Sequence, residues 1–131
     1  MKDAVVRDHM NQDPALIRQG SPITTVVDVL LSHKITGAPV VDGAGQLVGF
    51  VSEHDCIDVL IQQHTDSGYT PIVDDVMHGD VLTASPDDTI LSLAEKMGTL
   101  KPKNYPVVSG ERLLGVISRS DVLRAMCELG R

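Results

Sequence analysis

The chain has 131 residues, of which 42% are hydrophobic and 2% aromatic, and its formal net charge at pH 7 is −7. A chain of this length can bury one compact core, which we expect to be aliphatic because the sequence holds no Trp and a single Phe. Nucleic-acid binding needs a basic face and aromatic stacking platforms, so this composition argues against it. The sequence shows neither a signal peptide nor an apolar run near the ~20 residues that cross a bilayer, so we expect a cytoplasmic protein with no membrane partner.

The first half of the chain predicts a strand, a helix, a two-stranded hairpin and a second helix. Ser21 is expected to cap the first helix, with Pro22 as its first residue, where the missing N–H costs nothing. Apolar residues then recur at helical spacing until Gly37, which is expected to end the helix. In chain order the predicted elements are a strand at 15–17, a helix at 22–36, strands at 38–42 and 47–52, and a helix at 53–62.

The second half repeats the motifs of the first half. Pro39 and Pro106 are 67 residues apart, as are Met10 and Met77. Three further pairs are 66 residues apart: Gly49 and Gly115, Ser52 and Ser118, and Asp55 and Asp121. Matching spacings of this kind indicate two copies of one structural unit.

The second copy therefore predicts the same elements in the same order. Ser85 and Pro86 are expected to start its first helix, as Ser21 and Pro22 do in the first copy, with a capping-box-like pattern. The predicted elements are a strand at 81–83, a helix from Ser85, strands at 105–108 and 113–118, and a helix at 119–129. We assign residues 1–131 to a single module, with repeats at 5–62 and 73–128 and a linker at 63–72.

Neither repeat is large enough to bury its own sheet. Each supplies two helices and a few short strands, and the hairpin strands are nearly all apolar, as is usual for strands covered on both faces. We therefore predict an α+β fold in which two tandem β-α-β-β-α repeats pack through their sheets with pseudo-two-fold symmetry.

These motifs resemble those of a known family. A Ser-Pro helix start, an x-Pro-Val-Val strand and a Gly-h-h-Ser-x-x-Asp sequence (h is apolar) occur twice in register and are similar to the cystathionine-β-synthase (CBS) domain. The resemblance covers residues 5–128. It implies a tandem pair of CBS domains, called a Bateman module, which commonly binds AMP, ADP, ATP or S-adenosylmethionine, often forms homodimers and regulates another protein or domain.

The doubled Ser-x-x-Asp pattern has two physical interpretations. A carboxylate in the first turn of a helix can accept hydrogen bonds from the two hydroxyls of a ribose, and the helix N-terminus beside the serine favours an anion. The same pattern also describes a serine helix cap followed by an acid that suits the helix dipole. Repetition of the pattern beside the paired prolines and glycines favours ligand binding.

The resemblance assigns positions in this sequence to the ligand. It places Asp55 and Asp121 at the ribose and Ser52 and Ser118 near a phosphate. It places the base beside two groups of residues, namely Ile17, Gly37, Ala38 and Pro39 in the first repeat and Thr83, Asn104, Tyr105 and Pro106 in the second.

The two predicted clefts differ in charge. Arg119 follows Ser118 in the second repeat, whereas Glu53 and His54 follow Ser52 at the matching place in the first. Lys101 and Lys103 are expected to lie before the second hairpin, in a connection longer than that of the first repeat. We predict that the second repeat holds a phosphorylated nucleotide and that the first is empty or takes a less negatively charged ligand, for which His54 is a candidate contact. Two alternatives remain: the lysines form a solvated loop, or each copy's cations serve the other copy's cleft.

Catalysis and metal binding have little support in the sequence. Common nucleophile, zinc-protease and P-loop motifs are missing, and the five histidines show no paired spacing. We therefore expect no catalytic residues, no metal and no cofactor other than an adenine nucleotide held as a ligand. The leading hypothesis is a regulatory nucleotide-binding homodimer acting on an unidentified protein. The alternative is a ligand-free dimerisation or scaffold module, and an unrecognised enzyme comes third.

Overall fold

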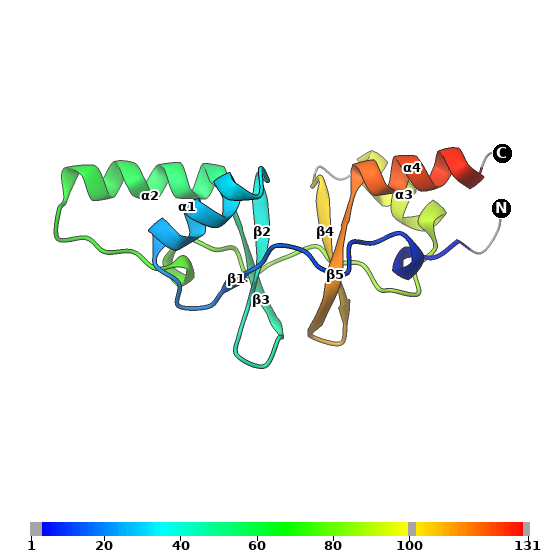
Figure 1. The fold of residues 1–131 in the computed structure, drawn as a ribbon, viewed down its shortest axis with the longest axis horizontal. Coiled ribbons are helices and arrows are strands. Elements are labelled where there is room, and N and C mark those ends of the chain that lie inside the picture. Colours follow the sequence, from blue (N-terminus) through cyan, green and yellow to red (C-terminus); the bar gives the residue numbers. More distant parts are fainter. Residues whose placement is uncertain (1–3, 100–101, 130–131) are drawn as a thin grey trace. The chain divides into compact units, whose positions relative to one another are not determined.

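The computed structural model describes residues 4–99 and 102–129 (Figure 1). The chain divides into two compact units. We call Ala15–Val81 the central unit, and we call Met1–Pro14 together with Leu82–Arg131 the split unit. Because both units mix helices with small sheets, the predicted α+β class is confirmed.

The central unit is built around a three-stranded sheet. Its strand order is β1-β2-β3, with β1 parallel to β2 and β2 antiparallel to β3. Its elements are β1 (Ile17–Arg18), α1 (Ile23–Ser32), β2 (Gly37–Val41), β3 (Leu47–Ser52), α2 (Glu53–Thr65) and the 3-10 helix η2 (Val73–Asp75).

The split unit has the same plan with a shorter first strand. The hairpin strands β4 and β5 are antiparallel, and Ala84 forms a single parallel bridge to Val107 in place of the strand expected at 81–83, so that strand prediction was wrong. The elements of this unit are the 3-10 helix η1 (Val6–Asp8), α3 (Ile90–Thr99), β4 (Asn104–Ser109), β5 (Arg112–Ser118) and α4 (Arg119–Leu129).

Each unit has a core of its own, built mainly from aliphatic side chains as the composition predicts. In the central unit Ile17, Val40 and Val51 are at most 1% exposed. In the split unit Val107 and Ile117 are completely buried, and Tyr105 is the aromatic exception at 1% exposure. No helix in the described parts of the chain is long and apolar enough to cross a bilayer.

The leading segment of each sequence repeat packs into the unit that contains the other repeat's hairpin. In the split unit the Val6 N–H donates to the Asp88 carbonyl at 2.9 Å. In the central unit the Val73 N–H donates to the Ser21 carbonyl at 2.8 Å. Both valines are completely buried. The compact units therefore do not coincide with the sequence repeats, because the two copies exchange their first turns.

One register relates the two copies from these valines to the paired prolines. Val6 and Val73 each begin a 3-10 helix, and Ile23 and Ile90 each begin a ten-residue helix. Both pairs are 67 residues apart, the spacing of Pro39 and Pro106. A turn that is one residue shorter in the second hairpin reduces the spacing to 66 for all later pairs.

This register corrects the predicted helix starts. Pro22, and not Ser21, is the N-cap of α1, and the Ser21 hydroxyl donates to the Arg18 carbonyl at 2.7 Å. Ser85 and Pro86 lie in a turn before α3, where the Ser85 N–H donates to an Asp88 carboxylate oxygen at 2.9 Å. The two Ser-Pro pairs are thus similar in sequence but do not occupy equivalent places.

The predicted longer connection in the second repeat was also wrong. Four residues separate α1 from β2, and four separate α3 from β4. Lys103 therefore corresponds to Thr36, and both carbonyls accept the first N–H of the following helix, from Arg119 and Glu53 respectively, at 2.9 Å. Lys101, which lies outside the described residues, corresponds in register to Lys34. The difference in charge thus rests on Lys103 and Arg119.

Gly49 and Gly115 allow the exchanged segments to approach the hairpins closely. A Cβ at Gly49 would lie 2.7 Å from the Met77 sulfur and 3.0 Å from the His78 carbonyl oxygen. A Cβ at Gly115 would overlap the Asn11 carbonyl oxygen. Since any side chain would block this approach, the glycine of the repeated motif is required for packing.

Candidate functional site

The two Ser-x-x-Asp sequences form equivalent helix caps. At the start of α4 the Ser118 N–H donates to Asp121 Oδ2 at 2.9 Å, and the Asp121 N–H donates to Ser118 Oγ at 3.1 Å. Ser52 and Asp55 make the same pair of bonds at the start of α2, at 2.9 and 3.2 Å, and the Ser52 hydroxyl also donates to Asp55 Oδ2 at 2.8 Å. The capping interpretation is therefore confirmed, and it leaves Oδ1 of each carboxylate outside the cap.

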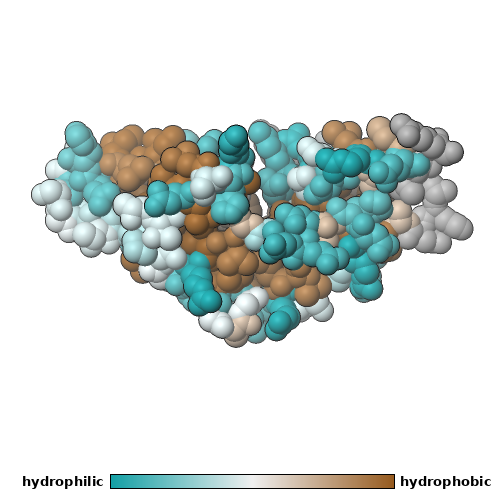
Figure 2. Space-filling view, viewed as in Figure 1, coloured by the Kyte–Doolittle hydropathy of each residue, from teal (hydrophilic) through white to brown (hydrophobic). Residues whose placement is uncertain are grey.

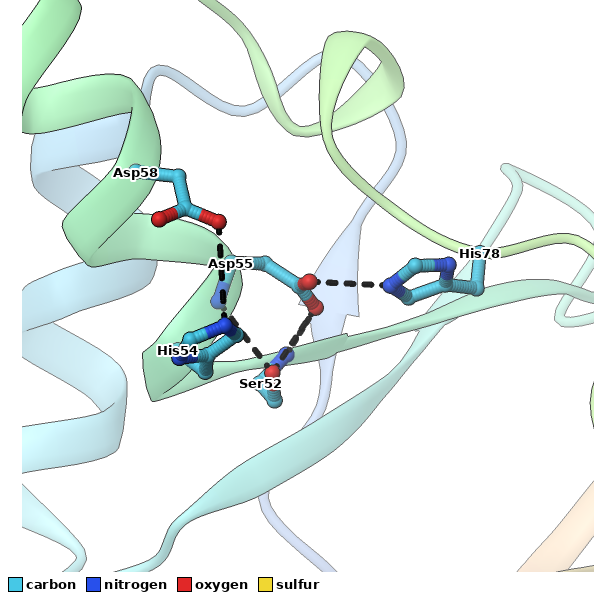
Figure 3. A network of polar contacts seen from close by, with 5 residues as sticks. All are labelled: Ser52, His54, Asp55, Asp58 and His78. Carbon is cyan, nitrogen blue, oxygen red and sulfur yellow. Dashed lines mark hydrogen bonds and ion pairs between the residues drawn. The ribbon is translucent and has the colours of Figure 1, made fainter.

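The two Oδ1 atoms have different partners. In the central unit the partner comes from a distant segment of the chain: His78, which follows η2, has its Nε2 atom 2.8 Å from Asp55 Oδ1 (Figure 3). In the split unit Arg124 Nη1 donates to Asp121 Oδ1 at 3.2 Å from one turn further along α4. The side chains of His78 and Arg124 are 68% and 65% exposed, so both can exchange the carboxylate for water.

The environment of Asp55 favours its ionised form. Burial alone would raise the pKa of Asp55, but hydrogen bonds from the Ser52 N–H, His78 and the Ser52 hydroxyl, with the charge of His78, lower the pKa overall. The Asp55 side chain is only 12% exposed, whereas that of Asp121 is 22% exposed. Asp55 is therefore the more enclosed and more completely bonded of the two carboxylates.

A pocket of about 460 Å³ lies beside the start of α4 in the split unit. Its lining residues are Lys103, Asn104, Ser118, Arg119, Ser120 and Leu123. The first four of these are among the residues predicted from the sequence, and the structure brings them together. Asp121 is adjacent in sequence to the lining residue Ser120 but is not itself in the lining. Sequence reasoning missed Leu123, which could have been found because it lies one helical turn after Arg119.

The equivalent positions in the central unit lack the two cations, and one of them carries an acid. In register, Lys103 corresponds to Thr36, Arg119 to Glu53, and Leu123 to Ile57. His54, which corresponds to Ser120, is 82% exposed and lies 3.8 Å from Asp58 on the same helix (Figure 3). Two cations beside one helix N-terminus are thus replaced by a neutral side chain and an acid beside the other.

Several predicted contacts are buried away from solvent. Ile17, Ala38 and Tyr105 are at most 1% exposed, so a ligand could not contact them without a local rearrangement. The Tyr105 hydroxyl has no hydrogen-bond partner among the residues that the structure describes, and burial raises the pKa of Tyr105. Pro39 and Pro106 are also buried in their strands, while Gly37 and Asn104 are half-buried at the strand starts.

Thr83 is not the counterpart of Ile17, as the sequence comparison had placed it. Ile17 pairs with Val40, and Ala84 makes the equivalent parallel bridge to Val107. Ala84 is therefore the counterpart of Ile17, and Thr83, which is half-buried, corresponds to Leu16. Residues 4–99 and 102–129 contain no cluster of three or more His, Cys, Asp or Glu side chains suited to a metal ion.

A family model matches most of the chain in two places. The model described as "CBS domain" matches residues 6–62 and 73–128. Among characterised and uncharacterised relatives, the chain is 26% identical over 121 residues to the uncharacterized protein MJ1225 of Methanocaldococcus jannaschii, covering 92% of this chain and 42% of the relative. It is 33% identical over 120 residues to a homoserine O-acetyltransferase of Methanococcoides burtonii, covering 91% of this chain and 23% of that enzyme. The chain thus spans less than half the length of these two relatives.

Two similar solved structures contain adenosine compounds. CBSX2 in complex with AMP has a TM-score of 0.85 and 26% identity, covering 98% of this chain and 99% of the other. The CBS domain pair of MJ0100, in complex with 5′-methylthioadenosine and S-adenosyl-L-methionine, has a TM-score of 0.77 and 25% identity, covering 96% and 98% of the two chains.

Proposed function

Because the chain belongs to the CBS domain family, we propose that it is a regulatory module that binds an adenosine-type nucleotide. The observation that carries this proposal is the pocket at the start of α4, with Lys103 and Arg119 in its lining. Asp121 follows the lining residue Ser120 in the first turn of the same helix. The ligands of the two similar structures, AMP in one and 5′-methylthioadenosine with S-adenosyl-L-methionine in the other, support the class of compound.

The split unit offers suitable partners for each part of AMP. The Oδ1 atom of Asp121 lies outside the helix cap and can accept from ribose hydroxyls once Arg124 releases it. A phosphate would meet the N-terminus of α4 together with the side chains of Arg119 and Lys103, and both factors favour an anion. The side chain of Leu123, which is 65% exposed, provides apolar surface in the same pocket.

Regulation would follow from a difference in ligand affinity between two arrangements of the chain. A ligand shifts a conformational equilibrium only to the extent that it binds one state more tightly than the other. In this proposal the nucleotide is a signal and is not chemically altered, and the regulated protein is unidentified. The cytoplasmic location and the packing of the repeats through their sheets stay predictions.

Exposed apolar surface on α2 favours a second role as a dimerisation module. Ile57, Leu60 and Ile61 are 54%, 37% and 62% exposed, and they line a shallow hollow of about 400 Å³ with His64 and Thr65. Figure 2 shows apolar side chains gathered over this helix, at the upper left of the view. Burial of such a patch in a homodimer would be favourable, so Ile61→Arg should convert a dimer into monomers in sedimentation experiments.

Calorimetry with adenosine, AMP, ADP, ATP and S-adenosylmethionine tests the nucleotide proposal. We expect AMP to bind more tightly than adenosine, because only AMP presents a phosphate to Lys103 and Arg119. Arg119→Glu should weaken AMP binding. Arg112→Glu is its matched control, since Arg112 is an exposed cation of the same unit outside the pocket lining. The absence of heat with every compound, from protein shown to be folded, would refute nucleotide binding and leave the dimerisation role.

A further inference from the structure

We propose that His78 controls ligand binding in the central unit by occupying the Asp55 carboxylate, so that a ribose binds there only when the imidazole leaves. This inference rests on the proposed function, because it takes Asp55 to be the ribose acceptor. It adds a specificity-determining residue that lies outside the repeated Ser-x-x-Asp motif. It also predicts that ligand binding in this unit strengthens as the pH rises.

The backbone fixes His78 beside β3. The Phe50 N–H donates to the His78 carbonyl and the His78 N–H donates to the Phe50 carbonyl, both at 2.9 Å. The neighbouring Gly49 permits this approach, since a Cβ there would lie 3.0 Å from the His78 carbonyl oxygen. β3 ends at Ser52 and is followed directly by α2, so the His78 ring faces the Asp55 carboxylate (Figure 3).

The split unit shows that the fold does not require a histidine at this position. Asn11 is the counterpart of His78, and it makes the same pair of backbone bonds with Val116, at 2.8 and 3.0 Å. The Asn11 side-chain oxygen instead accepts from the Asp13 N–H at 3.0 Å. The contact between a side chain of this segment and the helix-cap carboxylate is therefore specific to the central unit.

His78 competes for the one oxygen of Asp55 that a ligand could use. Oδ2 already accepts from the Ser52 N–H at 2.9 Å and from the Ser52 hydroxyl at 2.8 Å. Oδ1 is held by His78 Nε2 at 2.8 Å. A ribose hydroxyl must replace this bond, and the bond is stronger when the imidazole is protonated because charge-assisted hydrogen bonds exceed neutral ones.

Histidine ordinarily changes charge between about pH 5 and pH 8, so the competition should weaken across this range. Ligand binding to the central unit then releases a proton, and its affinity rises with pH. The His78 side chain is 68% exposed and can turn into solvent without disturbing the core.

Other ionisable groups lie on the elements that carry the pair. On α2 these are Glu53, His54, Cys56 and Asp58, and on η2 and the segment after it they are Asp74, Asp75 and Asp80. Lys34 and Asp42 flank β2. His54 is the second histidine of the site, and it lies near Asp58, 3.8 Å away. His54→Asn is therefore the control that separates an effect of His54 from an effect of His78.

The test uses adenosine, which carries no phosphate to titrate, and the variant His78→Asn, which gives the central unit the residue of the split unit. Adenosine binding is followed by the backbone amide resonances of residues 52–55 and 118–121 at about pH 5.5 and about pH 8. In the wild type and in His54→Asn we expect the affinity reported by residues 52–55 to rise about tenfold between these values. In His78→Asn the adenosine affinity reported by residues 52–55 should be the same at the two pH values.

The outcomes separate this inference from the proposed function. An equal rise in His78→Asn, a fall in affinity with pH, or binding seen only at residues 118–121 at every pH would overturn the role of His78 alone. Absence of an adenosine response at residues 52–55 would overturn the role of His78, and absence of a response to AMP in either unit as well would also overturn the nucleotide proposal. Folding of each variant is checked from the dispersion of the same spectra.

Discussion

The central unit and the split unit use one scaffold with different charges at the same places. Both have a ten-residue helix, an apolar hairpin, a glycine against the exchanged segment and a helix capped by Ser-x-x-Asp. They differ where Glu53 replaces Arg119, Thr36 replaces Lys103 and His78 replaces Asn11. The residues that build the fold are therefore similar in the two units. The units differ at a few other positions, which can give each its own ligand preference.

The largest expected effect concerns the two glycines at the exchanged segments. Gly115→Ala places a Cβ against the Asn11 backbone, whereas in Gly49→Ala the nearest atom is the flexible Met77 sulfur. We expect Gly115→Ala to lower the free energy of unfolding by about 3 kcal/mol and Gly49→Ala by about 1 kcal/mol, as is typical of overpacking. Urea denaturation measures both.

Gly43→Ala is the control for this pair, because a Cβ at Gly43 meets nothing within 4 Å. Its stability should match the wild type within about 0.5 kcal/mol. Equal losses for Gly115→Ala and Gly43→Ala would contradict the close approach of residue 11 to β5.

Exchange of charge between the helix starts should transfer the preference for phosphate. Arg119→Glu should weaken AMP binding by about tenfold or more, since it replaces a cation of the pocket by the acid found in the central unit. The reciprocal Glu53→Arg should strengthen AMP binding at residues 52–55. Calorimetry and amide shifts measure these changes. An unchanged affinity in Arg119→Glu, with Arg112→Glu also unchanged, would remove Arg119 from the site.

The smallest expected effect is the contribution of Asp55 to stability in acid. The native pKa of Asp55 lies below its ordinary value of 3.8, so the native state binds its proton less readily than the unfolded chain does. This contribution is complete above about pH 5 and is lost as the pH falls through the lowered native pKa. Asp55→Asn should lose less stability than the wild type between about pH 5 and pH 2. Parallel pH profiles of thermal unfolding would contradict this.

Much of the fold could be predicted because it depends on local patterns. The apolar periodicity of residues 23–31 and the paired prolines and glycines were sufficient for the helices, the hairpins and the repeat. The exchange of Val6 and Val73 between units was not predictable in this way, because it depends on contacts between distant segments. The Ser-Pro pairs misled the alignment, since Pro22 is an N-cap whereas Pro86 lies in a turn.

The sequence correctly grouped pocket-lining residues where they belong to the repeated motifs. Ser118, Arg119 and Asn104 follow from the motif positions, and they do line one pocket. His78 was missed because its counterpart is Asn11, so no repeated residue marks it. His78 meets Asp55 only when the exchanged segment pairs with β3 in the folded chain. A contact between such distant segments is not visible in the local sequence.

Titration of isotope-labelled protein with AMP, followed by backbone amide resonances, tests the account most directly. We predict that residues 103–104 and 118–121 respond at the lowest AMP concentrations and residues 52–55 only at higher ones. A first response at residues 52–55, or none in either group from folded protein, would contradict it.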